Sequence, residues 1–134
     1  MFQPKLTQAE ELDLLSIDQL VQDLDEEMTK ELLSCFLTDT SDVIDQIDTA
    51  LQAGDGEASR KAAHIMTGCC RSVNAHAAER LSKRIEHCAQ DGDFTEARKT
   101  VLELQEVFQA TASLALKYVQ TDVKPGVQLR DTKV

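Results

Sequence analysis

Apolar side chains recur every three or four positions along most of the chain, and this spacing is typical of amphipathic helices. The clearest run predicts a long helix that begins after Asp25, with Met28, Leu32, Leu33, Phe36, Leu37, Val43, Ile44, Ile47 and Leu51 on one face. The polar segment 38–42 (TDTSD) interrupts the run. The pattern leaves open whether this region is one helix or two with a kink between them.

Four further helices follow from the same spacing and from residues that begin or end helices. They are expected at about residues 16–24, 56–73, 76–90 and from 94 onward. Their predicted boundaries are a capping box at Ser16–Gln19, caps at Asp25, Asp55 and Asp93, and C-terminal stops at Gly54, Asn74 and Gly92. Short connections between amphipathic helices predict antiparallel neighbours. We therefore expect an all-α fold, an up-down antiparallel four-helix bundle with a short N-terminal accessory helix.

The two ends of the chain show a weaker pattern than the region between them. Residues 1–15 are polar and weakly periodic, so we expect a flexible lead-in there. Residues 121–134 are expected to form a polar C-terminal tail, which leaves 16–120 as the folded domain. Both prolines, Pro4 and Pro125, lie in these end segments, as a helical chain requires.

Charge and composition narrow the function classes. The 134 residues carry a net charge of −10, which argues against binding to nucleic acid or to an anionic membrane surface. No apolar run is long enough for a membrane span, and the start of the chain lacks the pattern of a signal peptide. We therefore expect a cytoplasmic, monomeric protein whose four cysteines are reduced and act as small core residues. The Cys and His spacing does not suggest a metal site.

The negative charge is concentrated in the first half of the chain. Residues 1–56 have a net charge of −12, whereas residues 57–134 have a net charge of +2. The second half therefore keeps positive charge within an acidic protein.

The helix predicted over 57–73 carries the most informative residue. On a helical wheel its apolar residues fall between about 100° and 260° from His64, so His64 lies at the middle of the polar face. Those apolar residues are Ala58, Ala62, Ala63, Ile65, Met66, Cys69, Cys70 and Val73. A core histidine is disfavoured by this geometry, while an ordinary solvated histidine remains open.

Two features beside His64 favour a functional role. Gly68 follows one turn later on the same face, where it weakens the helix by about 1 kcal/mol relative to Ala and would let a partner backbone approach. Arg60, Lys61 and Arg71 surround His64 and would favour a phosphoryl group there. The alternative is that these bases simply pair with surface acids, Glu57 and Glu79.

The stretch RKAAHIMTGCCRSVNAHAAERLSKRIE resembles the active helix, and the helix after it, of histidine-containing phosphotransfer (HPt) domains. The family pattern, roughly A-H-x-L-K-G followed by an apolar-acid or apolar-amide pair about 20 residues after the His, is matched by Ala63-His64, Met66, Gly68 and Ile85-Glu86. The resemblance covers about residues 16–118.

This resemblance implies a phosphorelay carrier without an enzyme centre of its own. His64 would accept a phosphoryl group from an aspartyl phosphate on the receiver domain of a hybrid histidine kinase and pass it to a response regulator. Glu86 would orient the imidazole, and the receiver would supply the Mg²⁺. Receiver docking is expected at Lys61 and Gly68, and at the apolar residues of the first helix, Ile17, Leu20 and Val21.

The sequence departs from the family pattern at three places. Thr67 stands where the common Lys lends positive charge to the phosphohistidine, so we expect Arg60 and Arg71 to supply that charge beside the Thr67 hydroxyl. Cys69-Cys70 replace a small hydroxyl pair, and Asn74 replaces a glycine cap. Two other readings remain open: a degenerate module that docks a kinase or receiver without carrying phosphate, and a plain helical adaptor.

Overall fold

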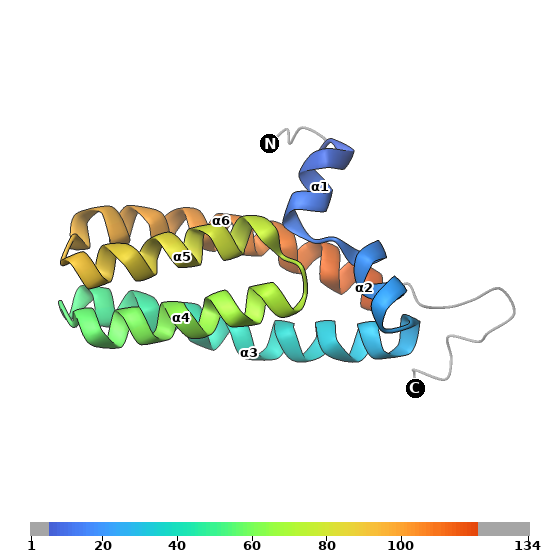
Figure 1. Cartoon of the computed structure of the whole chain (residues 1–134), viewed down its shortest axis with the longest axis horizontal. Helices are drawn as coiled ribbons and strands as arrows, with labels where there is room; N and C mark the ends of the chain where they lie inside the picture. The colour runs from blue at the N-terminus through green and yellow to red at the C-terminus, as the bar shows by residue number, and fades with distance from the viewer. Residues whose placement is uncertain (1–5, 121–134) are drawn as a thin grey trace, which may run out of the picture.

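The computed structural model describes residues 6–120, which fold into six helices and contain no strand (Figure 1). The helices are α1 (Gln8–Leu14), α2 (Ile17–Asp23), α3 (Glu26–Gln52), α4 (Gly56–Ser72), α5 (His76–Asp91) and α6 (Phe94–Gln120). None of them is both long and apolar enough to cross a membrane.

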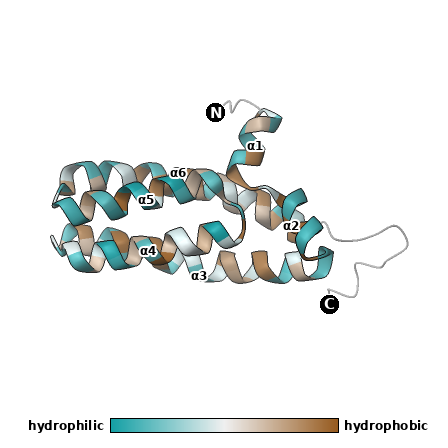
Figure 2. Cartoon of the chain, in the orientation of Figure 1, coloured by the Kyte–Doolittle hydropathy of each residue, from teal (hydrophilic) through white to brown (hydrophobic). Residues whose placement is uncertain are grey.

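The four long helices form the predicted up-down bundle. Helix α3 packs against α4 and α6, and α5 packs against the same two helices, so α4 and α6 stand on opposite corners. Apolar residues recur along each of them (Figure 2), and the side chains that they bury form one continuous core. The all-α fold class is therefore confirmed. The diagonal arrangement leaves one long face of α4 outside the core, between α3 and α5.

The predicted cap residues set the helix boundaries. The side chain of Asp25 accepts a hydrogen bond from the Met28 amide at 2.8 Å, and Asp55 accepts one from the Ala58 amide at 3.0 Å. Asn74 has a φ of +60°, a left-handed conformation that Asn tolerates better than most residues. These caps fix where α4 begins and ends, and so which of its faces meets the core.

Helix α3 is continuous through the polar segment 38–42. Within this segment Thr40 is fully buried, and its hydroxyl donates a hydrogen bond to the carbonyl of Phe36 one turn earlier. The buried hydroxyl is thus satisfied within the helix, which needs no kink to accommodate it. The long α3 spans the length of the bundle.

The expectation of a flexible lead-in over residues 1–15 is corrected by α1, which occupies Gln8–Leu14. Thr7 and Glu10 form a capping box at its start, and Leu14 is buried. Both guanidinium NH₂ groups of Arg80 in α5 donate to the Asp13 carboxylate, at 2.9 and 2.7 Å. The accessory region therefore contains two short helices, not one. The expected 121–134 tail lies outside the described residues.

The capping box expected at Ser16 does not form. The Ser16 hydroxyl donates instead to the carbonyl of Leu12 at 2.9 Å, so it closes the end of α1 and leaves the start of α2 without a side-chain cap. The competing acceptor, the Leu12 carbonyl, exists only because residues 8–14 form α1.

The four cysteines are free, but they do not share one environment. Cys70 is fully buried in the core, as expected, whereas Cys35 is exposed on α3, which corrects the expectation that all four are core residues. Burial also raises the pKa of the Cys70 thiol to about 12. Since the thiolate is the reactive form, the two residues should differ in reactivity.

We therefore expect iodoacetamide at pH 8 to alkylate Cys35 rapidly and to leave Cys70 unmodified while the protein is folded. Peptide mapping by mass spectrometry measures both sites in one sample. Denaturation before alkylation is the control, and it should make Cys70 reactive. Equal rates at Cys35 and Cys70 in the folded protein would contradict the packing described for α4.

Candidate functional site

His64 projects from the outer face of α4 into solvent. Its side chain is 71% exposed, while Ala63 and Met66, on the opposite face of the same helix, are completely buried. The helix thus anchors the backbone of His64 on the core and presents the imidazole on a surface. An imidazole in this position is accessible to another protein.

Glu86, 22 residues later on α5, contacts the imidazole directly. Its Oε2 atom lies 2.7 Å from Nδ1 of His64, and its own side chain is only 17% exposed. An ionised carboxylate can only accept hydrogen bonds, so the hydrogen of this bond is on Nδ1. The other ring nitrogen, Nε2, then keeps its lone pair. The contact therefore favours the tautomer in which Nε2 is the nucleophile.

Thr67 lies beneath the histidine and not beside it on the polar surface, which corrects its placement on the wheel. It is only 3% exposed, because α5 covers this side of α4. Its hydroxyl lies 2.9 Å from the carbonyl oxygen of Ala63 and 3.3 Å from Oε1 of Glu86. Thr67, Glu86 and His64 therefore form a connected chain of polar contacts between α4 and α5.

Gly68 lies on the exposed face of α4, one turn after His64. Outside the neighbouring backbone of α4, no atom of residues 6–120 would lie within 4 Å of a Cβ atom at this position, so packing in the described part of the chain does not require a glycine here. The space left by the missing side chain opens to solvent next to the imidazole. This geometry agrees with a role in close approach by a partner.

The three bases around His64 all make ion pairs with acids. Arg60 and Lys61 both contact Glu57, at 3.2 and 3.8 Å, and Arg71 contacts Glu79 of α5 at 2.9 Å. The Arg60 guanidinium lowers the pKa of the Glu57 carboxyl, chiefly through their hydrogen bond. The structure therefore shows the alternative named in the sequence analysis, in which these bases pair with surface acids. Each of these pairs has at least one largely exposed partner, and ion pairs at the surface contribute little to stability.

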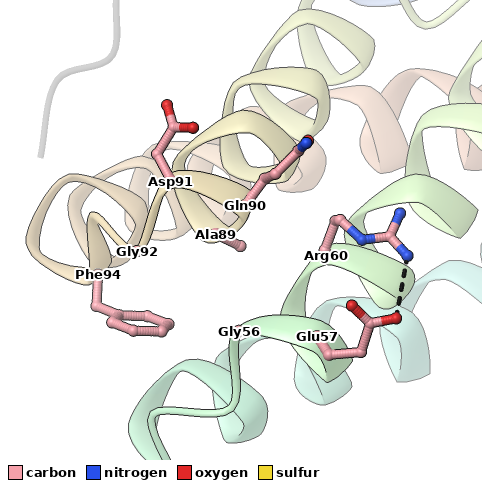
Figure 3. A pocket seen from close by; sticks show the side chains of 8 residues that line it. All are labelled: Gly56, Glu57, Arg60, Ala89, Gln90, Asp91, Gly92 and Phe94. Carbon is pink, nitrogen blue, oxygen red and sulfur yellow. Dashed lines mark hydrogen bonds and ion pairs between the residues drawn. The ribbon is translucent and has the colours of Figure 1, made fainter.

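A shallow cleft lies one turn before His64, between the start of α4 and the end of α5 (Figure 3). Its walls include the Arg60–Glu57 pair, Gln90 and the ring of Phe94. His64 does not line this cleft. Within residues 6–120 no group of three or more His, Cys, Asp or Glu side chains is arranged to hold a metal ion.

The structure does not support the docking role expected for the first apolar helix. Leu20 is only 4% exposed and belongs to the core, and Ile17 is half-buried against that core. Val21 is half-buried as well. These residues belong to α2, which lies beyond the end of α4 (Figure 1). The apolar side of α2 holds it on the bundle, so Leu20 is corrected from a docking residue to a core residue.

Ile65 is the apolar residue beside His64 that the wheel misplaced. It falls at the edge of the predicted buried face, and its side chain is 52% exposed. It lines an apolar groove between α3 and α4 together with Ala50, Ala53, Ala58 and Ala62. On the helical wheel Ile65 lies about 100° from His64, at the limit of the predicted buried face. This borderline position was the signal that could have identified Ile65 as exposed.

These features define a class of protein: a four-helix bundle that presents one carboxylate-bound histidine on an exposed helix face. The profile of the Hpt domain family matches residues 31–114, which include both His64 and Glu86. The chain therefore belongs to the Hpt domain family, whose members act as phosphotransfer domains in phosphorelays. The match begins within α3 and leaves out α1 and α2.

The fold has a solved counterpart. The crystal structure of histidine-containing phosphotransfer protein B (HptB) from Pseudomonas aeruginosa PAO1 is similar, with a TM-score of 0.72. The sequences are 24% identical, and the similarity covers 89% of this chain and 97% of that chain. A comparison with curated proteins found no match. At this level of identity the structural likeness establishes the fold alone.

Proposed function

We propose that this protein carries a phosphoryl group on Nε2 of His64 between two receiver domains. The contact between His64 and Glu86 is the observation that carries the proposal, because it combines an exposed imidazole with a fixed tautomer. Family membership supplies the reaction class, and the contact supplies the residue.

The transfer requires only one bond to form and one to break. Nε2 attacks the phosphorus of the receiver's aspartyl phosphate, the P–O bond to the aspartate breaks, and the carboxylate leaves with the electron pair. The imidazole becomes a cation that retains its hydrogen on Nδ1, and the carboxylate of Glu86 balances that charge. The reverse sequence delivers the phosphoryl group to a second receiver. Mg²⁺ belongs to the receiver's site.

We propose that Arg60 and Arg71 supply positive charge to the phosphoryl group in place of the family's Lys. Each guanidinium has five N–H donors, and the ion pairs with Glu57 and Glu79 leave donors free. Both residues flank His64 on the exposed face of α4. An incoming phosphoryl group, with its greater charge, can compete with the carboxylates of Glu57 and Glu79 for them.

Removing either arginine should therefore slow the transfer. We expect Arg60→Ala and Arg71→Ala each to lower the rate of labelling by a phosphorylated receiver, and the phosphohistidine half-life, by about threefold, the scale of one exposed charge contact. The measurement is a time course of the radiolabelled protein. Arg98→Ala, which removes a base from the diagonally opposite helix, is the control. Unchanged rate and half-life in both variants would refute the charge assignment.

The receiver must cover the surface around His64, because its aspartate has to reach Nε2. A stable protein interface buries about 800 Å² on each partner, which is far more than the imidazole alone. Gly68 and Lys61 lie within that area, and so does Ile65 with the apolar groove behind it. We therefore propose that receivers dock over the α3–α4 groove as well as over Gly68, and not on α2.

The exposed Ile65 provides a direct test of this docking surface. We expect Ile65→Ser to weaken binding to the receiver by about 10-fold, because the variant loses the apolar area that docking would bury. The stability of the variant should change little, since Ile65 is already half exposed. Isothermal titration calorimetry measures the affinity.

The matched control is Leu102→Ser, which alters an exposed apolar side chain on α6; Leu102 is 62% exposed, against 52% for Ile65. Helix α6 lies diagonally opposite α4, so this change should leave receiver binding unaltered. If Leu102→Ser weakened binding and Ile65→Ser did not, the docking surface would be misassigned.

The partners follow at the level of class. Receiver domains are the partners of Hpt domains, and we propose one on a hybrid histidine kinase and another on a response regulator. We also propose that the protein acts in the cytoplasm, where both kinds of receiver are found. The experiment for the function as a whole is a reconstituted relay, in which label must move from a first receiver through this protein to a second.

The departure at Thr67 supports one other candidate function, a module that docks receivers without carrying phosphate. In that case the receiver binds, but no label appears on His64 and the second receiver stays unlabelled. The reconstituted relay separates the two, because binding and labelling are measured on the same sample.

A further inference from the structure

The hydroxyl of Thr67 is already committed to groups within the protein. It has a single hydrogen to donate, and two acceptors lie within range: the carbonyl of Ala63 at 2.9 Å and Oε1 of Glu86 at 3.3 Å. A phosphoryl oxygen is also an acceptor and would need that same hydrogen. Thr67 is buried at the seam between α4 and α5, whereas Nε2 of His64 is exposed, so the hydroxyl faces acceptors inside the protein and not a phosphoryl group on Nε2.

The two oxygens of Glu86 are held by different partners. Oε2 receives the Nδ1 hydrogen of His64 at 2.7 Å, while Oε1 faces the Thr67 hydroxyl. A Glu side chain turns about three bonds, so a single contact at one oxygen would leave the carboxylate plane free to rotate. The second contact comes from a buried, β-branched side chain with few rotamers. It restricts the carboxylate to one orientation.

We propose that Thr67 is a positioning residue, which holds the carboxylate of Glu86 so that it fixes the tautomer and orientation of His64. Its role in transfer, but not its contact with Glu86, rests on the proposed function. Thr67 stands where the family pattern has a Lys that lends positive charge. In this protein the residue at that position would act through Glu86 instead. The positive charge for the phosphoryl group has to come from other residues.

The role of Thr67 is separable from folding. Thr67→Val removes the hydroxyl hydrogen together with both of its contacts, so no buried donor is left without a partner. Thr100 on α6 offers a matched comparison. It is fully buried too, and its hydroxyl donates to the Glu96 carbonyl at 2.8 Å, but it contacts no carboxylate.

The test compares Thr67→Val, Thr67→Ser and Thr100→Val, first in the unphosphorylated protein. Nitrogen-15 NMR of the imidazole reports the fraction of His64 with its hydrogen on Nδ1. We expect Thr67→Val to lower this fraction and Thr67→Ser, which keeps the hydroxyl, to restore it. Thr100→Val should lose similar stability in thermal unfolding but leave the His64 spectrum unchanged. If Thr67→Val does not fold, Thr67→Ala replaces it.

The second readout is the rate of labelling by a phosphorylated receiver. We expect a loss of about 3- to 10-fold in Thr67→Val, the effect of one hydrogen bond to a charged group at moderate distance. A wild-type tautomer ratio in Thr67→Val, or the same spectral change in Thr100→Val, would overturn the inference. If wild type itself is never labelled, the proposed function fails, whereas the NMR comparison still decides the role of Thr67.

Discussion

His64→Gln is expected to abolish labelling by a phosphorylated receiver, with a loss of at least about 100-fold, because glutamine has no nucleophilic nitrogen. The variant should fold normally, since the imidazole is exposed and its replacement removes no core contact. A time course with radiolabelled receiver measures the loss, and circular dichroism checks the fold. The residual label in the variant sets the background for every other rate.

His87→Gln is the control for this experiment. His87 is also exposed and lies on α5 next to Glu86, but it follows Glu86 on the outward side of the helix. It should therefore be labelled as wild type is. If labelling survived in His64→Gln but disappeared in His87→Gln, the phosphoryl acceptor would be His87 on α5. That result would contradict our proposal.

Gly68→Gln should have opposite effects on stability and on transfer. A Cβ atom at this position has open space around it, and replacing a mid-helix glycine stabilises a helix by up to about 1 kcal/mol. The same side chain would stand beside the imidazole, where the receiver must approach. We expect thermal stability to rise and the labelling rate to fall by about 30-fold, equivalent to about 2 kcal/mol of lost transition-state binding.

Gly68→Ala completes this test as a graded control. It should raise stability by a similar amount, but its single methyl group should slow the transfer by only a few fold. Transfer at the wild-type rate in Gly68→Gln would show that the partner does not approach over this part of α4. A fall in stability in either variant would instead contradict the open space described at Gly68.

The fold was predictable from the sequence wherever the signal is local. Side chains such as Asp25 and Asp55 cap a helix within their own turn, so the boundaries of α3 and α4 follow from short patterns. The Thr7–Glu10 capping box is an equally local signal, and it marks the start of α1. The sequence could not decide whether segment 38–42 continues the helix or kinks it. The answer depends on whether the Thr40 hydroxyl has an acceptor inside the helix.

The site was predictable only in part, because a helical wheel describes one helix at a time. It placed His64 correctly on the polar face. It could not place Thr67, which is polar but covered by α5, or Ile65, which is apolar but left exposed beside α3. The expectation for Glu86 came from the family resemblance, since its contact with His64 depends on the register between α4 and α5.

The most direct test of the central claim is to locate the phosphorus after transfer from a receiver. Phosphorus-31 and nitrogen-15 NMR of the labelled protein should show a single acid-labile, alkali-stable phosphoramidate on Nε2 of His64, with the hydrogen on Nδ1 retained beside Glu86. A phosphoryl group on Nδ1 or on another residue would contradict the proposal. So would the absence of any label from a protein that binds the receiver.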